Sequence, residues 1–233
     1  MLIIVDKRLS YKALKELSHW GEVIMFGTEN VTYEAISCHP DVFFCPVKDK
    51  LIVAPNCPDE YKNKISEKGI QLIDGNNPVG LHYPESAYYN AVITDTILIH
   101  NLKFTDKRIF DSSPDVKYIN VNQAYTRCNL LHISGNNFIT SDRGIEKKLL
   151  SCDFNVLYNN PEQICLPGFK NGFFGGCCGM VKNKLFINGS LQFVSEKKKF
   201  RMFCDQLEVE IIELTNDALS DIGSILFIPE NSD

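Results

Sequence analysis

The sequence predicts an α/β fold in which five hairpin-helix-strand units form a ring, an α/β propeller. A short unit recurs at about 40–50 residues, a period typical of solenoids, propellers and arrays. The stretches 90–99 and 178–187 both have a polar start, an apolar run, a polar turn and a second apolar run. The first unit lacks half of its hairpin, and an unpaired apolar strand remains at 223–228. Pairing this strand with 2–5 would close the ring and remove exposed strand edges.

Each unit is expected to contain an apolar hairpin, a helix that begins at a capping or turn residue, and a lone strand. The complete hairpins are predicted at 42–54, 90–100, 128–140 and 178–187. The helices are predicted to begin after Ser10, at Pro58-Asp59, at Thr105-Asp106, at Ser141-Asp142 and near Ser195. The lone strands are predicted at 23–26, 70–73, 116–121, 154–158 and 209–214.

A doubly wound sheet is the alternative fold. It fits less well because tight hairpins make antiparallel pairs, whereas a doubly wound sheet is mostly parallel. We therefore expect one propeller domain over residues 1–228 and a short disordered tail at 229–233.

Composition narrows the classes of partner. A formal net charge of -5 argues against nucleic acid, because binding phosphate needs a basic face. No apolar stretch approaches the ~20 residues of a membrane span, and the N-terminus does not resemble a signal peptide. We expect a cytoplasmic protein with mostly reduced cysteines and no membrane partner. The nine cysteines form no Cys-x-x-Cys pair, so no metal site and no cofactor are predicted. The oligomeric state is left open.

The repeat also predicts where a site lies. The residues that open successive hairpins should occupy equivalent positions near the mouth of a central cavity, and such a cavity is the default ligand site. These residues are Asp41, Asn90, Cys128, Cys178 and Asp221, flanked by His39 and Arg127.

These residue types suggest a specific chemistry. Cys128 is the candidate nucleophile, since a nearby cation such as Arg127 or a histidine can activate a thiol. His39 is the candidate general base, and Asp142 completes the catalytic candidates. Asp41, Asp142 and Asp221 could hold a guanidinium or ammonium group through charge-assisted hydrogen bonds. The alternative is that polar residues end loops and that Cys128 packs as a small buried hydrophobe.

The segment 172–179 contains four glycines in eight residues. Gly175, Gly176 and the following Cys178 could line a ligand, with an anion-binding nest of amides. A tight connection between strands explains the glycines equally well. The neighbours Cys177 and Cys178 could also form a strained vicinal disulfide.

Several stretches together resemble an uncharacterised bacterial family of the guanidine-modifying-enzyme superfamily, the penteins. They are His39-Pro40-Asp41, the segments 123–128 and 139–145, Gly172-Phe-Phe-Gly-Gly176, and 219–224. The resemblance implies a five-unit α/β propeller. It also implies an enzyme whose cysteine attacks a guanidinium carbon with help from a histidine and carboxylates.

The chain departs from that pattern at the closing unit. Those enzymes place their cysteine there, whereas segment 216–223 has none and carries Asp221. Their histidine also has no counterpart near 172–179. Two functions therefore stay open: a cysteine-dependent hydrolase or transferase on a small guanidino-like cation, and a non-catalytic binding module.

Overall fold

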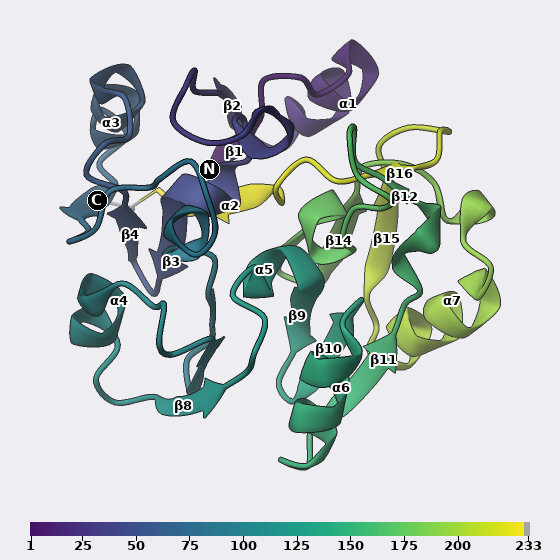
Figure 1. Ribbon diagram of the computed structural model, residues 1–233. Helices are drawn as coiled ribbons and strands as arrows, with labels where there is room; N and C mark the ends of the chain where they lie inside the picture. The colour runs from purple at the N-terminus through teal and green to yellow at the C-terminus, as the bar shows by residue number, and fades with distance from the viewer. Residues whose placement is uncertain (231–233) are drawn as a thin grey trace.

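Five three-stranded sheets and one two-stranded sheet contain the strands of residues 1–230, which the computed structural model describes (Figure 1). In each three-stranded sheet, the middle strand pairs antiparallel with one neighbour and parallel with the other. The middle strands are β1 (Leu2–Asp6), β4 (Lys50–Val53), β7 (Ile97–His100), β10 (Asn137–Thr140) and β14 (Lys184–Ile187). Their antiparallel partners are β17 (Leu226–Ile228), β3 (Phe44–Val47), β6 (Val92–Ile93), β9 (Leu130–Ser134) and β13 (Cys178–Val181). Their parallel partners are β2 (Glu22–Phe26), β5 (Gln71–Asp74), β8 (Lys117–Asn120), β11 (Asn155–Tyr158) and β15 (Glu210–Glu213).

A helix connects each middle strand to its parallel partner, as the sequence predicts. These helices are α1 (Tyr11–Leu17), α3 (Asp59–Ser66), α4 (Lys107–Ser112), α6 (Arg143–Leu150) and α7 (Lys197–Gln206). The side chains of Ser10, Asp106 and Asp142 cap three of them by accepting a backbone N–H. Figure 1 shows these helices toward the periphery of the molecule. None of the helices in residues 1–230 has the length and apolarity to cross a lipid bilayer.

Short helical turns replace the starts of two predicted hairpins. Residues expected to begin strands lie in α2 (Pro40–Phe43) and α5 (Thr126–Asn129), so β3 and β9 begin later than predicted. Turns of four residues have no hydrophobic period that a sequence can show. Single 3-10 turns also occur at η1 (Glu34–Ile36), η2 (Glu85–Ala87), η3 (Pro161–Gln163), η4 (Gly175–Cys177) and η5 (Leu191–Phe193). The parallel pair of β12 (Ile164–Cys165) and β16 (Leu219–Ser220) was not predicted either.

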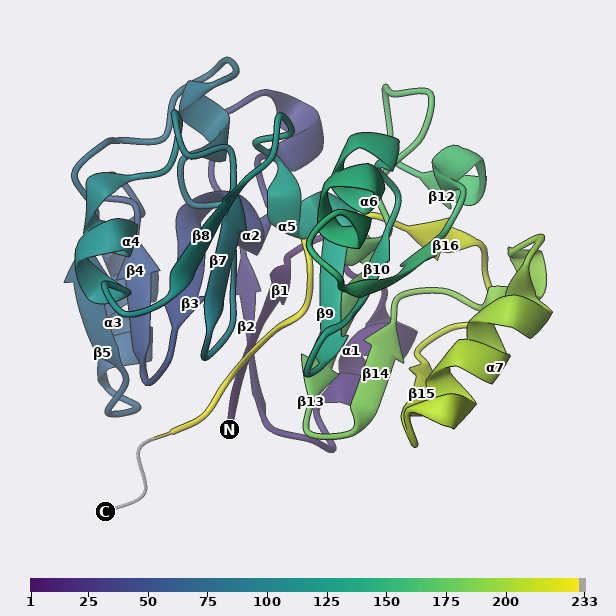
Figure 2. The same ribbon diagram turned by 90° about the horizontal axis from the view of Figure 1, so that it is seen from below.

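The terminal strands pair with each other as expected. β17 runs antiparallel to β1, with Leu2 opposite Ile228 and Ile4 opposite Leu226. The outer hairpin strands of successive sheets lie beside one another: β6 beside β3 and β9, and β13 beside β9 and β17. Figure 2 shows α2 and α5 between the two halves of the molecule. These arrangements bring the starts of the hairpins to the middle.

The C-terminal tail predicted at 229–233 falls largely outside the described structure. Glu230 forms an ion pair with the N-terminal amine at 3.0 Å. Residues 231–233 lie beyond the described residues.

Candidate functional site

Two helical turns position the central side chains. Pro40 begins α2, and its ring restricts the preceding His39 to extended backbone (φ −74°, ψ 114°). Asp41 follows in the first turn, where its N–H donates to the carbonyl of Gly223 at 3.2 Å. In α5, the N–H of Arg127 donates to the carbonyl of Asn90 at 2.9 Å. These two hydrogen bonds connect α2 with the segment of Gly223, and α5 with the segment of Asn90.

Cys128 lies at the centre of a buried hydrogen-bond network. Its Sγ donates to Asp41 Oδ2 at 3.1 Å and accepts from Asn90 Nδ2 at 3.3 Å. Asn90 also accepts the N–H of Cys128 at 3.1 Å and donates to the Asp41 carbonyl at 3.0 Å. Ser224 Oγ donates to Asp41 Oδ2, the oxygen that also accepts from Cys128, at 2.7 Å. The structure therefore brings Asp41, Asn90 and Cys128 together, as the repeat predicts.

Burial controls the protonation of this network. It raises the pKa of the Cys128 thiol well above its usual value, and the nearby Asp41 and Asp221 carboxylates raise it further. Burial also raises the pKa of Asp41, against the opposing effect of its hydrogen bonds from Ser224 and Cys128. The Cys128 side chain is thus a neutral thiol that donates to the Asp41 carboxyl group.

His39 is buried without a hydrogen bond. Only 1% of the residue is exposed, and neither ring nitrogen has a hydrogen-bond partner among residues 1–230. Nε2 lies 3.9 Å from Asp6 Oδ2, and Nδ1 lies 3.9 Å from Asp221 Oδ1. Burial lowers the pKa of His39 to about 3, with a smaller contribution from the positive charge of Arg8. A neutral imidazole therefore lies between two carboxyl groups.

Glycines allow the backbone to approach Asp221 and His39. Asp221 accepts the N–H of Phe173 at 2.9 Å and that of Gly223 at 3.0 Å. A Cβ on Gly176 would lie 1.9 Å from Asp221 Oδ1. Gly223 has φ +65°, and a Cβ there would lie 2.2 Å from the Cβ of His39. Burial raises the pKa of Asp221 to about 7, and the carboxylates of Asp41 and Asp6 add to this shift.

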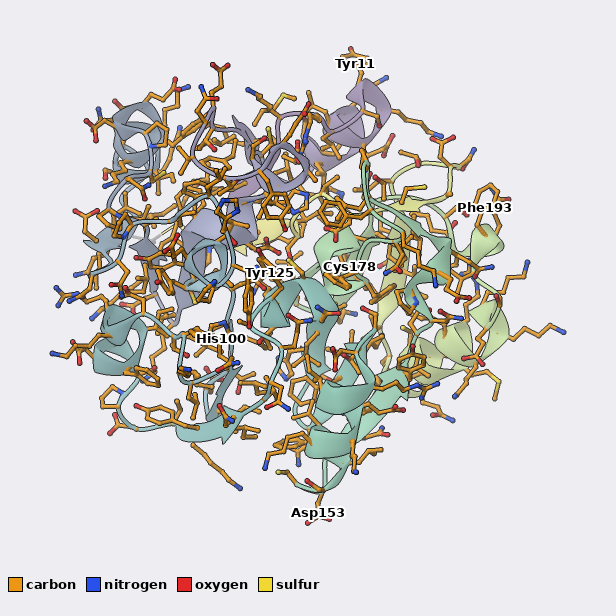
Figure 3. The ribbon with its side chains drawn as sticks, in the orientation of Figure 1. Tyr11, His100, Tyr125, Asp153, Cys178 and Phe193 are labelled. Carbon is orange, nitrogen blue, oxygen red and sulfur yellow. The ribbon has the colours of Figure 1, made fainter. Side chains whose placement is uncertain are left out.

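A cavity of about 140 Å³ lies against these groups. His39, Cys128, Asp221 and Asn171 are among its polar lining residues, and four aromatic residues also line it. The rings belong to Tyr33, Tyr125, Phe169 and Phe173. Figure 3 shows Tyr125 near the middle of the molecule, beside α5. The cavity joins three of the predicted site residues in one enclosed space.

A second cavity of about 150 Å³ is lined by three more of the predicted residues, Arg127, Gly175 and Cys178. Ser224 and apolar side chains of β6 and β9 also line it. The Nε of Arg127 is buried and has no hydrogen-bond partner within residues 1–230. Burial lowers the pKa of its guanidinium, and the Asp41 carboxylate opposes that shift. Arg127 and Cys178 are therefore separated from the cavity of Cys128 and His39.

Asp142 lies outside both cavities. Its Oδ1 accepts the N–H of Ile145 at 2.8 Å, which makes it the cap of α6. It lines a different surface hollow together with Tyr83 and Lys148. The structure therefore places Asp142 away from Cys128, in the role of a helix cap.

The glycine-rich segment packs tightly between elements. A Cβ on Gly175 would lie 2.1 Å from the Arg127 carbonyl oxygen, so this glycine allows η4 to lie against α5. The neighbouring Cys177 and Cys178 are both free thiols. The glycines thus allow close packing at α5 and at Asp221. This matches the expectation that the segment is a tight connection between strands.

Sequence reasoning missed three contributors to the site. Ser224 holds Asp41, Asp6 faces His39, and Arg8 holds Asp6 through a 2.6 Å ion pair. The signal for Asp6 and Ser224 was their place at the ends of the two terminal strands, which the closure of the first sheet brings together.

Comparisons with solved structures identify the fold. SxtG, an amidinotransferase of saxitoxin biosynthesis from Microseira wollei, matches with TM-score 0.58 and 9% identity over 100% of this chain and 95% of that one. DDAH from Pseudomonas aeruginosa, complexed with citrulline, matches with TM-score 0.51 and 9% identity over 91% of each chain. Agmatine deiminase from C. jejuni matches with TM-score 0.51 and 10% identity over 94% of this chain and 78% of that one. The chain therefore has the pentein fold.

A family model described as a family of unknown function (DUF6873) matches residues 4–226. No curated protein matches the chain.

Proposed function

Because the chain belongs to the family of unknown function DUF6873 and has the pentein fold, we propose that it acts on a small guanidino-like cation in the 140 Å³ cavity. In this proposal, Cys128 is the nucleophile of a divergent hydrolase or amidinotransferase. The observation that carries it is the convergence of Cys128, His39 and Asp221 on one cavity.

The charge and shape of the cavity favour such a ligand. Asp221 and the nearby Asp41 are buried carboxyl groups whose pKa values are raised by burial. A bound cation would favour the ionised form of these carboxyl groups and pair with them, and the rings of Tyr33 and Tyr125, which line the cavity, would attract it further. The volume equals roughly five water molecules at ~30 Å³ each. That space suits a guanidinium group rather than a large substrate.

The proposed reaction uses the neutral state of both reacting groups. The charge of a bound guanidinium stabilises the Cys128 thiolate, and His39 accepts the thiol proton. Sγ then bonds to the guanidinium carbon, the C–N bond breaks, and the leaving amine takes the proton from His39. Water or a second amine next adds to the carbon and releases the thiol. Hydrolysis or amidino transfer is the outcome, according to which nucleophile enters.

We also propose that the five sheets surround one pseudo-fivefold axis that passes through the network of Cys128. The pairing of β17 with β1 and the sequence of neighbours β3, β6, β9, β13 and β17 support this arrangement. The site residues would then open successive units of a closed propeller.

A non-catalytic binding module is the second candidate. The raised pKa of the Cys128 thiol and its donation to Asp41 favour it, because a thiol in this state is a weak nucleophile. The absence of a cysteine from segment 216–223 points the same way. This candidate keeps the same cation in the same cavity but predicts no turnover.

Binding and turnover are tested separately. Isothermal titration with agmatine, L-arginine and methylguanidine measures binding, and mass spectrometry measures the released amine and any amidino product. We expect Asp221→Asn to weaken binding at least tenfold. The exposed Asp217 is the matched control, and Asp217→Asn should bind as the unmodified protein does.

Product formation by the unmodified protein distinguishes the two candidates. If the protein is an enzyme, the unmodified protein forms product, whereas Cys128→Ser binds the cation and forms none. Binding by the unmodified protein without any product selects the binding module. No binding of any of the three compounds overturns the proposal.

A further inference from the structure

Three potential metal ligands meet in the buried network. One ligand atom each from His39, Asp41 and Cys128 lies within 4.8 Å of the other two. The three residues are 1%, 0% and 4% exposed. Cys128 lies in α5, and His39 and Asp41 lie on either side of Pro40 at the start of α2. No spacing pattern in the sequence joins the three.

Unpartnered polar atoms point to a missing partner in this cluster. Both ring nitrogens of His39 and Oδ1 of Asp41 are buried and accept or donate no hydrogen bond within residues 1–230. Buried polar atoms are normally satisfied, and each exception calls for an explanation such as an ion. A cation that accepts a lone pair from Asp41 Oδ1 and one from a ring nitrogen of His39 provides a partner for two of these three atoms.

We propose that this cluster binds a zinc-class divalent ion through Cys128 Sγ, Asp41 Oδ1 and one ring nitrogen of His39. Sulfur, imidazole nitrogen and carboxylate oxygen are together the donor set that Zn²⁺ prefers. When the Zn–S bond forms, the thiol proton leaves to solvent. The thiolate and the carboxylate then balance the two charges of the ion.

The surrounding groups are arranged to support these ligands. Asn90 Nδ2 already donates to Sγ at 3.3 Å, a contact that stabilises a thiolate. Ser224 Oγ donates to Asp41 Oδ2 at 2.7 Å, which leaves Oδ1 for the ion. Whichever ring nitrogen binds, the other faces a carboxylate 3.9 Å away, on Asp6 or on Asp221. Carboxylates in this position orient metal-bound histidines.

One coordination position stays open toward the 140 Å³ cavity, which His39 and Cys128 line. Three protein ligands and a fourth position for water or another ligand are typical of exchangeable zinc sites. The inference does not depend on the proposed function, because metal binding is measured with the metal alone. The ion would bind Cys128 Sγ, so the metal-bound protein could not use Cys128 as a nucleophile.

The first test uses Co²⁺ as a spectroscopic probe on the metal-free protein. We expect one equivalent to produce a sulfur-to-cobalt charge-transfer band that Zn²⁺ abolishes by competition. Cys128→Ser should lose the band and weaken Co²⁺ binding at least tenfold. Two matched controls, Cys178→Ser in the neighbouring cavity and Cys165→Ser on the surface, should keep both. A band that survives Cys128→Ser, or disappears with either control, overturns the proposal.

A second measurement needs no variant and covers the case in which Cys128→Ser does not fold. X-ray absorption of the Zn²⁺-loaded unmodified protein should give one sulfur at about 2.3 Å and nitrogen or oxygen ligands at about 2.0–2.1 Å. Two or more sulfur ligands, or only oxygen ligands, would show that the ion binds elsewhere. Absence of binding at equimolar Zn²⁺ contradicts the proposal equally.

Discussion

Single buried residues determine the acid-base behaviour of this protein. His39 and Asp221 both favour their neutral forms, because burial disfavours charge on either group. His100 is a useful contrast, since both of its ring nitrogens are hydrogen-bonded, to Thr105 Oγ1 and to the Ala124 carbonyl at 2.7 Å. The hydrogen bonds to both ring nitrogens indicate a structural role for His100. The ring nitrogens of His39 have no such partners within residues 1–230.

The raised pKa of Asp221 predicts that the difference in stability between the unmodified protein and Asp221→Asn depends on pH. The carboxyl group ionises near pH 3.9 when unfolded and near pH 7 when folded. Between these values the folded state binds more protons, so the contribution of Asp221 to stability falls as pH rises. The free energy of unfolding of the unmodified protein relative to Asp221→Asn should therefore drop by at least about 1 kcal/mol between pH 4.5 and 7.5. Urea unfolding at both pH values measures this, and a constant or rising difference contradicts the assignment.

The thiols should differ in reactivity. Cys165 is exposed, whereas Cys128 is buried and the pKa of its thiol is raised. Because the thiolate is the reactive species, iodoacetamide at pH 8 should alkylate Cys165 at least tenfold faster than Cys128 in the folded, ligand-free protein. Peptide mapping by mass spectrometry gives the two rates, and urea-unfolded protein is the control with similar rates. Faster labelling of Cys128 in the folded protein would contradict a neutral buried thiol.

At the scale of elements, η4 and α5 pack so closely that glycine is required between them. Gly175 lies against the Arg127 carbonyl, and Gly176 lies against the Asp221 carboxyl. The glycine-rich segment therefore links the position of α5 to that of Asp221. Either contact would be lost if the segment moved outward by the width of a methyl group.

A methyl group at Gly176 should destabilise the protein. Its Cβ would lie 1.9 Å from Asp221 Oδ1, so the carboxyl group must move from its two backbone donors. We expect Gly176→Ala to reduce the free energy of unfolding by about 1–3 kcal/mol. Gly144→Ala in α6 is the control, because Gly144 is exposed and its Cβ would lie no closer than 3.0 Å to another atom, Asp142 Oδ1. The substitution gains helix propensity and should change stability by less than about 1 kcal/mol. Equal effects of the two substitutions in urea unfolding would refute this explanation.

Many helices and strands were predictable because the signals that predict them lie within a few neighbouring residues. Apolar runs and the caps Ser10, Asp106 and Asp142 predicted the strands and helices. The turns α2 and α5 were missed because four residues have no period. The site was partly predictable, since Asp41, Asn90 and Cys128 occupy equivalent places in the repeat. Ser224 and Asp6 were missed although the pairing of the terminal strands was predicted, because they lie outside the column of residues that open the hairpins.

At the scale of the whole molecule, the two ends of the chain share one sheet, and both contact the same aromatic ring of the last unit. Trp20, which follows α1, packs edge-on against Phe186 of β14 with ring centroids 5.1 Å apart. Phe186 in turn packs against Phe227 of β17 at 4.8 Å. The two ends of the chain therefore depend on each other for packing.

Disruption of the last strand should lower the stability of the entire protein. Leu226 is fully buried and pairs with Ile4, so Leu226→Ala should cost about 2–5 kcal/mol. The control Met202→Ala, at a side chain that is 61% exposed, should change stability by less than about 0.5 kcal/mol. Trp20 fluorescence and far-ultraviolet circular dichroism should report the same shifted urea midpoint. Separate midpoints for the two probes would show that the terminal units unfold independently.

The two central cavities are lined from the same elements. Arg127 and Cys128 are consecutive in α5, yet Arg127 lines one cavity and Cys128 lines the other. Ser224 and Asp221 of the closing segment divide between the two cavities in the same way. A substitution that displaces α5 would therefore alter the lining of both cavities at once, so the two cannot be redesigned independently.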